Sequence, residues 1–183
     1  EVLKSDAQAL VVPKHWLPED NGADLKGKTL LSATQTYLCM AKVNACFFQL
    51  PYLKKPFGNE NCHTTAVIHP TAKISADAII GPGAVIAAPV TIGSGSFIGA
   101  NCVVETHTTV GENCFIHPLV YLGHNCVIGN RVEIKPHSTI ASDGYGYASD
   151  EHGGHHRIPH YGAVIIEDDV HNGANVNIDR GTF

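Results

Sequence analysis

The sequence predicts a mainly β protein: a left-handed parallel β-helix preceded by part of a small α/β domain. The first observation is a repeat in which every sixth position carries an aliphatic side chain without interruption. These positions are Ile68, Ile74, Ile80, Ile86, Ile92, Ile98, Val104, Val110, Ile116, Leu122, Ile128, Ile134 and Ile140. A period of six fits neither the 3.6-residue period of a helix nor the alternation of a half-exposed strand, so it indicates a repeat architecture.

The second observation is a row of small or slender residues four positions after each aliphatic one. Its members include Ala72, Ala78, Ala84, Ser96, Cys102, Thr108, Cys114, Cys126 and Ser138. Three such segments make one coil, so each inward side chain is expected to stack on its equivalent in the next coil. Triangular coils of this type are wound left-handed, which is an exception to the right-handed crossover rule.

The third observation is that the repeat does not cover the whole chain. Residues 1–57 predict the partial α/β domain, residues 58–65 a linker, and residues 66–183 the β-helix. At 183 residues, two structural units are the simplest interpretation.

Within the first unit, the order of elements predicted is strand, loop, strand and helix. Apolar runs at residues 9–12 and 29–32 predict the strands, and helical spacing over residues 35–49 predicts a helix that ends before Pro51. At that spacing, Tyr37, Phe47 and Phe48 are expected in the core, with a ligand-facing role as the alternative. Aromatic side chains serve both purposes, because their rings offer apolar surface to a core or to a ligand.

Charge and cysteine content restrict the classes of partner. The net charge is −5, and residues 58–183 carry five basic against twelve acidic side chains, which argues against nucleic acid and anionic membranes as partners. No apolar run or leader indicates a membrane protein, so a soluble cytoplasmic protein is expected. Cys102, Cys114 and Cys126 are twelve residues apart, on three faces of the coil, and are expected to be reduced core thiols.

The repeat is interrupted after Ile140, and the next convincing inward residue is Ile166. We therefore predict an extruded loop over residues 141–163. It combines the run Asp143-Gly144-Tyr145-Gly146-Tyr147-Ala148 with a histidine-rich stretch from His152 to His160. Long loops that leave a rigid scaffold usually carry function, although Tyr145 and Tyr147 could instead cover the coil wall.

Several motifs together resemble one enzyme family. They are the Asp143–Ala148 run, Ile158-Pro159, the return Ile178-Asp179-Arg180-Gly181, and Tyr37-Leu38 with Ala41. The pattern resembles that of the UDP-3-O-acylglucosamine N-acyltransferases of lipid A biosynthesis. The resemblance implies transfer of a 3-hydroxyacyl chain from acyl carrier protein to the amine of a UDP-3-O-acylglucosamine, by a homotrimer with active sites in the clefts. It also implies that Asp143, Gly144, Tyr145, Gly146 and Tyr147 bind substrate.

Comparison with the same family predicts that this chain is truncated at both ends. The family's uridine-binding domain starts before residue 1, and its Asn-Pro pair is Gln35-Thr36 here. Its catalytic histidine, in an Ile-Ala-His-Asn segment, is expected beyond residue 183. Within the chain, Leu122-Gly123-His124-Asn125 resembles that segment, so His124 is a candidate catalytic base, with a structural or subunit-contacting role as the alternative.

Acyl transfer from a thioester needs a base for the acceptor's proton and a donor for the developing oxyanion, but no cofactor, metal or enzyme nucleophile. Three alternative functions stay open. One is another hexapeptide acyl- or acetyltransferase acting on a nucleotide sugar, and one is a non-catalytic β-helix. The third, a zinc carbonic anhydrase built on a similar coil, would gather three histidines, and His117 and His124 are spaced too widely for it.

Overall fold

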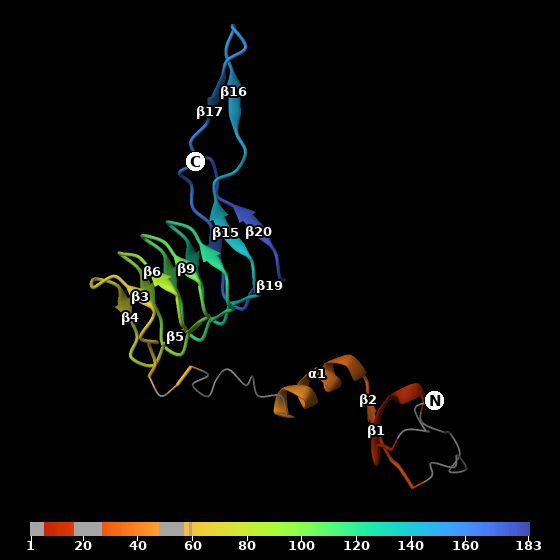
Figure 1. Cartoon of the computed structure of the whole chain (residues 1–183). Helices are drawn as coiled ribbons and strands as arrows, with labels where there is room; N and C mark the ends of the chain where they lie inside the picture. Colours follow the sequence, from red (N-terminus) through yellow and green to blue (C-terminus); the bar gives the residue numbers. More distant parts are fainter. Residues whose placement is uncertain (1–5, 17–26, 48–56, 59) are drawn as a thin grey trace. The chain divides into compact units, whose positions relative to one another are not determined.

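The computed structural model describes residues 6–16, 27–47, 57–58 and 60–183. The chain divides into two compact units, residues 1–54 and residues 55–183. In the second unit, very short strands follow one another around a coil that repeats many times (Figure 1). The parallel β-helix that the repeat predicts is therefore confirmed.

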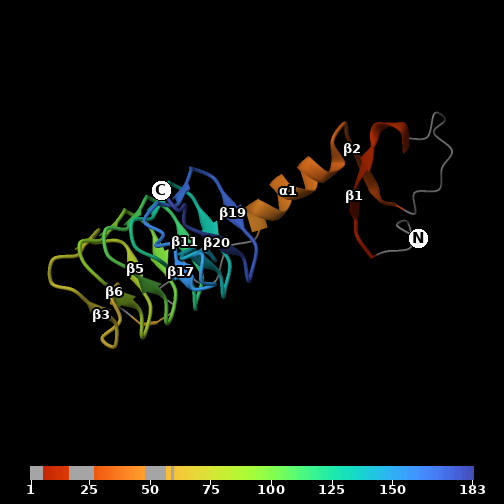
Figure 2. The same ribbon diagram turned by 90° about the horizontal axis from the view of Figure 1, so that it is seen from above.

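The β-helix has three parallel sheets, and each full coil contributes one strand to each sheet. The first sheet comprises β4 (Lys73–Ile74), β7 (Thr91–Ile92), β10 (Thr109–Val110), β13 (Val127–Ile128) and β18 (Ile165–Ile166). The second comprises β5 (Ile79–Ile80), β8 (Phe97–Ile98), β11 (Phe115–Ile116), β14 (Glu133–Ile134) and β19 (His171–Asn172). The third comprises β3 (Val67–Ile68), β6 (Val85–Ile86), β9 (Val103–Val104), β12 (Tyr121–Leu122), β15 (Thr139–Ser142) and β20 (Asn177–Asp179). Figure 2 shows the coils from above.

The core of the coil consists of the inward residue of each strand. Ile98 pairs with Ile116, and Ile116 with Ile134, so identical side chains stack along the axis. From Ile80 to Ile140 every one of these aliphatic residues is buried. Ile68 and Ile74, in the first coil, are half-buried. Burial of one such side chain contributes about 1.5–3 kcal/mol, and the aliphatic row is continuous from Ile80 to Ile140.

The second inward row is also confirmed, and its polar members are hydrogen-bonded to the next coil. Ser96 Oγ donates to the Gly111 carbonyl at 2.7 Å, and Thr108 Oγ1 to the Gly123 carbonyl at 2.8 Å. Cys102 Sγ lies 3.0 Å from the His117 carbonyl. Burial raises the pKa of both the Cys102 and Cys126 thiols to about 11, so they are protonated at neutral pH. The three core cysteines are free thiols, as expected.

Corners of the coil need a backbone conformation that most residues avoid. Asn101, Asn113 and Asn125 have φ near +55° to +60°, where asparagine is tolerated better than most side chains. Glycines allow successive coils to approach closely: a Cβ on Gly93 would lie 2.5 Å from the Gly111 carbonyl oxygen. The repeated Gly and Asn residues therefore reflect the geometry of the corners.

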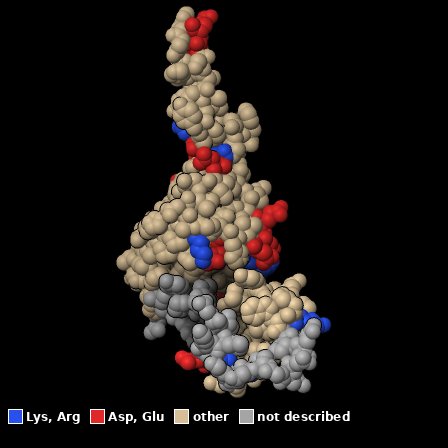
Figure 3. Space-filling view, turned by 90° about the vertical axis from the view of Figure 1, so that its right-hand side faces the viewer, with Lys and Arg blue, Asp and Glu red and all other residues tan. Residues whose placement is uncertain are grey.

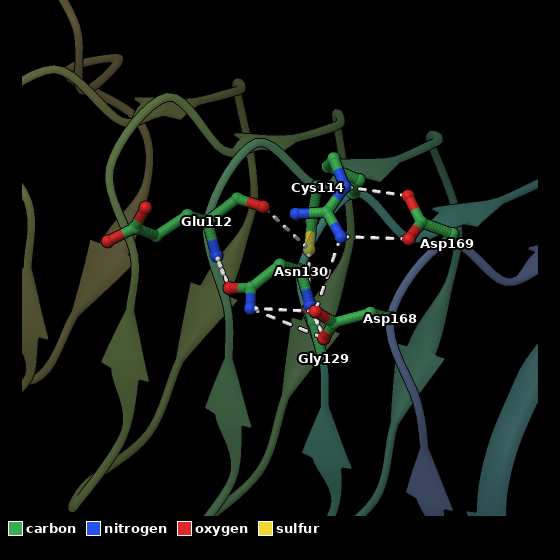
Figure 4. Close-up of polar contacts among 7 residues, drawn as sticks. Glu112, Cys114, Gly129, Asn130, Asp168 and Asp169 are labelled. Atoms are coloured by element: carbon green, nitrogen blue, oxygen red, sulfur yellow. Dashed lines mark hydrogen bonds and ion pairs between the residues drawn. The ribbon is translucent and has the colours of Figure 1, made fainter.

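The coil resumes in register after the predicted loop. Val127 pairs with Ile165, which lies 38 residues further along the chain, whereas Thr109 pairs with Val127, 18 residues away. A polar clamp closes the corner there (Figure 4). Asp168 accepts hydrogen bonds from the Asn130 backbone and side chain, and Arg131 contacts Asp169 at 2.6 and 2.8 Å. The clamp aligns the coil after the insertion with the coil before it.

The loop itself forms an antiparallel hairpin, β16 (Tyr147–Ser149) with β17 (His155–Arg157), that projects from the coil (Figure 1). Every residue of both strands is exposed. Asp150 closes the turn by accepting the N–H groups of His152 and Gly154 at 2.9 and 2.8 Å. Figure 3 shows acidic side chains at the tip of this hairpin and both charge signs at its base, with few charges between.

The first unit contains β1 (Ala9–Pro13), a short 3-10 helix (Lys14–Trp16), β2 (Thr29–Ala33) and α1 (Thr36–Phe47). The two strands are parallel, as an α/β unit requires. Tyr37 and Phe47 are 83% and 84% exposed, so their expected place in a core is wrong for the described residues. Helical spacing alone does not supply a partner, and the described part of this unit offers α1 only two strands. Phe48 lies outside the described residues.

Within the part of the chain that the structure describes, no helix is both long enough and apolar enough to cross a membrane.

Candidate functional site

The candidate site lies where the hairpin leaves the wall, that is, the three stacked sheets of the β-helix. It occupies the corner that follows the strands of the third sheet. Glu105, His124 and Asp143 follow β9, β12 and β15, and Arg180 follows β20. Neighbouring strands of this sheet are hydrogen-bonded in that order, so residues far apart in the sequence meet at one corner. The corner thus joins successive coils to the hairpin.

A β-bulge at Ala141 turns the chain out of the wall. Ile140 pairs with Ile178, but the next pair is Ser142 with Asp179, which leaves Ala141 without a partner residue. Ala141 is fully buried and has φ of +61°. A bulge bends its strand and redirects the side chains that follow, which is how Asp143 comes to lie beside the corner.

Arg180 is the centre of the site and is 4% exposed. Its Nε donates to the Ala141 carbonyl at 3.1 Å, and its Nη2 donates to the same oxygen. The Nε also lies 3.2 Å from Asp143 Oδ1, and Nη1 contacts His124 Nε2. Space for the guanidinium depends on Gly123, because a Cβ there would lie 2.9 Å from Arg180 Nη2.

Asp143 joins two guanidinium groups. Its Oδ1 faces Arg180, and its Oδ2 accepts a hydrogen bond from Nη2 of Arg157, the last residue of β17. The carboxylate therefore ties the returning strand of the hairpin to the wall. It is still 35% exposed, so its remaining lone pairs face solvent.

His124 lies between Arg180 and an acidic group. Its Nδ1 is 3.6 Å from Glu105 Oε2, which is close enough for electrostatic attraction but longer than an ordinary hydrogen bond. Glu105 also lies close enough to Tyr121 to oppose ionisation of its phenol. Burial, followed by the effect of the Glu105 carboxylate, raises the pKa of Tyr121 to about 12, so the phenol stays a neutral donor.

In the Asp143–Ala148 run, the two glycines lie against the His160 ring, and the two tyrosines lie on the other side of the backbone. A Cβ on Gly144 or Gly146 would lie 3.3 or 3.0 Å from the His160 ring, so that ring packs against bare backbone. Tyr145 and Tyr147 occupy the other face, with ring centroids 5.0 Å apart and exposures of 93% and 49%. Tyr145 therefore does not cover the coil wall, whereas Tyr147 is only half exposed and its role stays a prediction.

In the structure, Asp143 and His124 both contact the guanidinium of Arg180. Other residues at this site were not singled out from the sequence. No motif in the sequence includes Glu105, and Arg157 and His160 belong only to the histidine-rich stretch of the predicted loop. The repeat did carry one usable signal, because Glu105 and His124 follow consecutive strands of one sheet. No sequence pattern indicated that Arg157 would contact Asp143.

His117 belongs to a different corner. Its Nε2 lies 2.9 Å from Glu133 Oε1, after a strand of the second sheet, and its ring packs edge-on against Phe115. Within the described ranges, no group of three or more His, Cys, Asp or Glu side chains is arranged to hold a metal ion.

Comparisons with known proteins agree with the repeat and the motifs. The bacterial transferase hexapeptide family, described as six repeats, matches residues 66–106 and 107–142. A protein of Xanthomonas axonopodis pv. citri named UDP-3-O-acylglucosamine N-acyltransferase is 49% identical over 180 residues, which are 98% of this chain and 50% of that protein.

Shorter matches carry the same name. The proteins of Syntrophobacter fumaroxidans and Wolinella succinogenes are 52% and 59% identical over 56 residues, 31% of this chain and 16% and 18% of theirs. A solved Francisella novicida UDP-N-acetylglucosamine acyltransferase aligns with 65% of this chain and 45% of its own at 23% identity, with a TM-score of 0.25, too low to support an argument. The chain spans about half the length of the Xanthomonas relative and less of the others. The resemblance to these acyltransferases is confirmed.

Proposed function

From this relationship, we propose that the protein to which the chain belongs is a UDP-3-O-acylglucosamine N-acyltransferase. In this proposal it moves a 3-hydroxyacyl chain from acyl carrier protein to the sugar amine during lipid A synthesis, as a cytoplasmic homotrimer. The single observation that carries the proposal is 49% identity across 98% of the chain, because that span includes the coil, the hairpin motif and the return segment.

The reaction exchanges one bond to the acyl carbonyl for another. The amine nitrogen attacks the thioester carbon, the C–N bond forms, and the C–S bond breaks with the electron pair leaving on sulfur. The amine proton passes to a base and then to the thiolate, so no oxidant or cofactor is needed. Backbone N–H groups or a cationic side chain can stabilise the oxyanion that forms on the carbonyl oxygen.

We assign acceptor binding to the face of the loop that carries Tyr145 and Tyr147, together with Asp143. Exposed, adjacent phenol rings offer both apolar surface and hydroxyl groups, which suits a sugar or an acyl chain. Gly144 and Gly146 support this face from behind by letting the His160 ring pack against the backbone. Exposure of the tyrosines is what favours a binding role over a packing role.

The test is an acyl-transfer assay with the complete product of the gene, using a UDP-3-O-acylglucosamine and a 3-hydroxyacyl-acyl carrier protein. Mass spectrometry should show a nucleotide sugar with a second acyl chain. Acetyl-coenzyme A with a UDP-amino sugar is the matched reaction for the alternative of another hexapeptide transferase. Acetylation without acylation would favour that alternative, and no transfer in either reaction would favour a non-catalytic β-helix.

The loop assignment is tested in the same assay with Asp143→Ala and Tyr147→Phe. Both should raise KM for the acceptor or lower kcat. The melting temperature should stay within a few degrees for Tyr147→Phe, whereas Asp143→Ala also removes the carboxylate partner of the buried Arg180 and should lower it further. Unaltered kinetics beside a large loss of stability would show that the loop supports the core instead of binding substrate.

A further inference from the structure

We propose that Arg180 is a positioning residue that fixes the tautomer of His124 and, through Asp143, the orientation of the hairpin. His124 then acts as a hydrogen-bond acceptor in this network and not as the general base. The part of this proposal that concerns catalysis rests on the proposed function, whereas the part that concerns the tautomer does not.

Arg180 carries a permanent charge in a buried position. Its side chain is 1% exposed, and within the described part of the chain its carboxylate partner is Asp143, itself partly exposed. Burying a charge costs several kcal/mol unless its hydrogen bonds are satisfied. Arg180 satisfies them with a carbonyl, an imidazole and a carboxylate, from Ala141, His124 and Asp143. A planar guanidinium can reach all three at once, and a lysine ammonium cannot reproduce that fork.

The contact with Arg180 decides which nitrogen of His124 carries the proton. Arg180 can only donate, so the His124 Nε2 that it contacts must be an acceptor, with no hydrogen of its own. In a neutral ring the hydrogen is then on Nδ1, the nitrogen that faces Glu105 Oε2 at 3.6 Å. The Nε2 lone pair is already engaged by the guanidinium, so it is not available to accept the proton of an attacking amine.

The contacts are continuous from the coil to the binding face. They form a chain in the order Glu105, His124, Arg180, Asp143 and Arg157. The first members belong to the coil and the last belongs to β17 of the hairpin. Because Asp143 directly precedes the Gly-Tyr-Gly-Tyr run, fixing its carboxylate also fixes where that run starts.

The tautomer can be measured on the 183-residue chain without any substrate. Long-range nitrogen–proton NMR on ¹⁵N-histidine-labelled protein at neutral pH should show His124 protonated on Nδ1 and unprotonated on Nε2. Arg180→Gln, whose amide oxygen can accept from Nε2–H, should shift His124 toward the Nε2–H form, whereas Arg180→Lys, which can still only donate, should shift it less. Arg131→Gln is the matched control, since Arg131 also pairs with aspartates but at another corner, and it should leave the His124 signals unchanged.

The wild-type spectrum alone decides the matter even if a variant fails to fold. An Nε2–H tautomer, or a doubly protonated ring, in the wild-type chain would overturn the proposal. So would a His124 signal that is the same in folded Arg180→Gln protein as in the wild type.

Kinetics on the complete protein provide a second, separate readout. His124→Gln keeps an oxygen that can accept from Arg180 but cannot act as a base, so it should lower kcat by less than about tenfold, whereas loss of a general base costs about 10²–10⁴-fold. His124→Leu keeps no acceptor and should raise KM for the acceptor sugar by about tenfold, the effect of losing one charged hydrogen bond. A fall of 10²-fold or more in kcat for both variants would identify His124 as the base. Absence of transfer by the wild type would instead refute the proposed function and leave the NMR result standing.

Discussion

The coil wall and the hairpin are held in place by different kinds of interaction. In the wall, residues 18 positions apart stack apolar side chains inside the coil, as Ile98, Ile116 and Ile134 do. In the hairpin, no residue of β16 or β17 is buried, and its base is held by polar contacts of Asp143 with Arg180 and Arg157. Stability is therefore concentrated in the wall, whereas the position of the hairpin depends on a few charged groups.

The largest loss is expected from a cavity in the wall. Ile116→Ala should lower the free energy of unfolding by about 2–5 kcal/mol, because Ile116 is fully buried and its neighbours can relax only partly. Ile165→Ala is the matched control, an isoleucine of another coil strand whose side chain is 68% exposed, and should cost at most about 0.5 kcal/mol. Equal losses in urea titrations of the two variants would contradict the view that the inward row holds the wall.

Alkaline pH should weaken the wall through its thiols. The folded-state pKa of Cys102 is about 11, above the usual value near 9, because burial disfavours the thiolate. The unfolded chain therefore loses this proton first, and the free energy of unfolding falls as pH rises from 9 to 11, by roughly 2–3 kcal/mol for this group. Cys102→Ala should show a correspondingly smaller decline. Identical pH profiles for the variant and the wild type would show that Cys102 ionises as easily in the folded protein.

Adding a side chain where successive coils approach closely should also destabilise the protein, by a smaller amount. Gly111→Ala would place a Cβ 2.6 Å from the Gly129 carbonyl carbon, which is backbone and cannot turn aside, so we expect a loss of about 1–3 kcal/mol. Gly173→Ala meets only the Val176 side chain at 3.7 Å and should be tolerated. Thermal unfolding of both variants measures the difference. A melting temperature for Gly111→Ala that matched that of Gly173→Ala would mean that the coils can separate at little cost.

The smallest effect is expected at the tip of the hairpin. Glu151 and His152 are each 86% exposed, and replacing both by Ala should change the free energy of unfolding by less than about 0.5 kcal/mol. Hydrogen exchange should show fast exchange at the tip and slow exchange in β8, β11 and β14 for both proteins. A large loss of coil stability in the double variant would remove the contrast between the two regions.

Much of the wall could be predicted from the sequence, because a strict repeat reports burial position by position. The inward aliphatic residues, the small row that includes Cys102 and the interruption after Ile140 all agree with the structure. One inward position departs from the pattern: Asn172 pairs with Ile134, and its buried amide nitrogen has no hydrogen-bond partner within the described chain.

The site was less predictable because its contacts depend on the path of the chain outside the repeat. Asp143 and His124 were singled out, but their meeting on Arg180 requires the bulge at Ala141, which no periodicity encodes. Arg157 reaches Asp143 only because the loop folds as a hairpin with a particular pairing. Helical spacing likewise placed Tyr37 in a core, although spacing shows only that residues share a face of a helix.

The register maintained across the insertion also bears on how the β-helix forms. Propagation of folding from one coil to the next normally closes a loop of 18 residues, and at the hairpin it must close one of 38. Loop-closure entropy grows only with the logarithm of length, so this longer step costs about 0.6 kcal/mol more than an ordinary one. Contacts of Asn130 and Arg131 with Asp168 and Asp169 join the two ends of this longer loop. A growing coil can therefore cross the hairpin with little delay, and the hairpin's length and composition are free to vary without interrupting the order in which coils assemble.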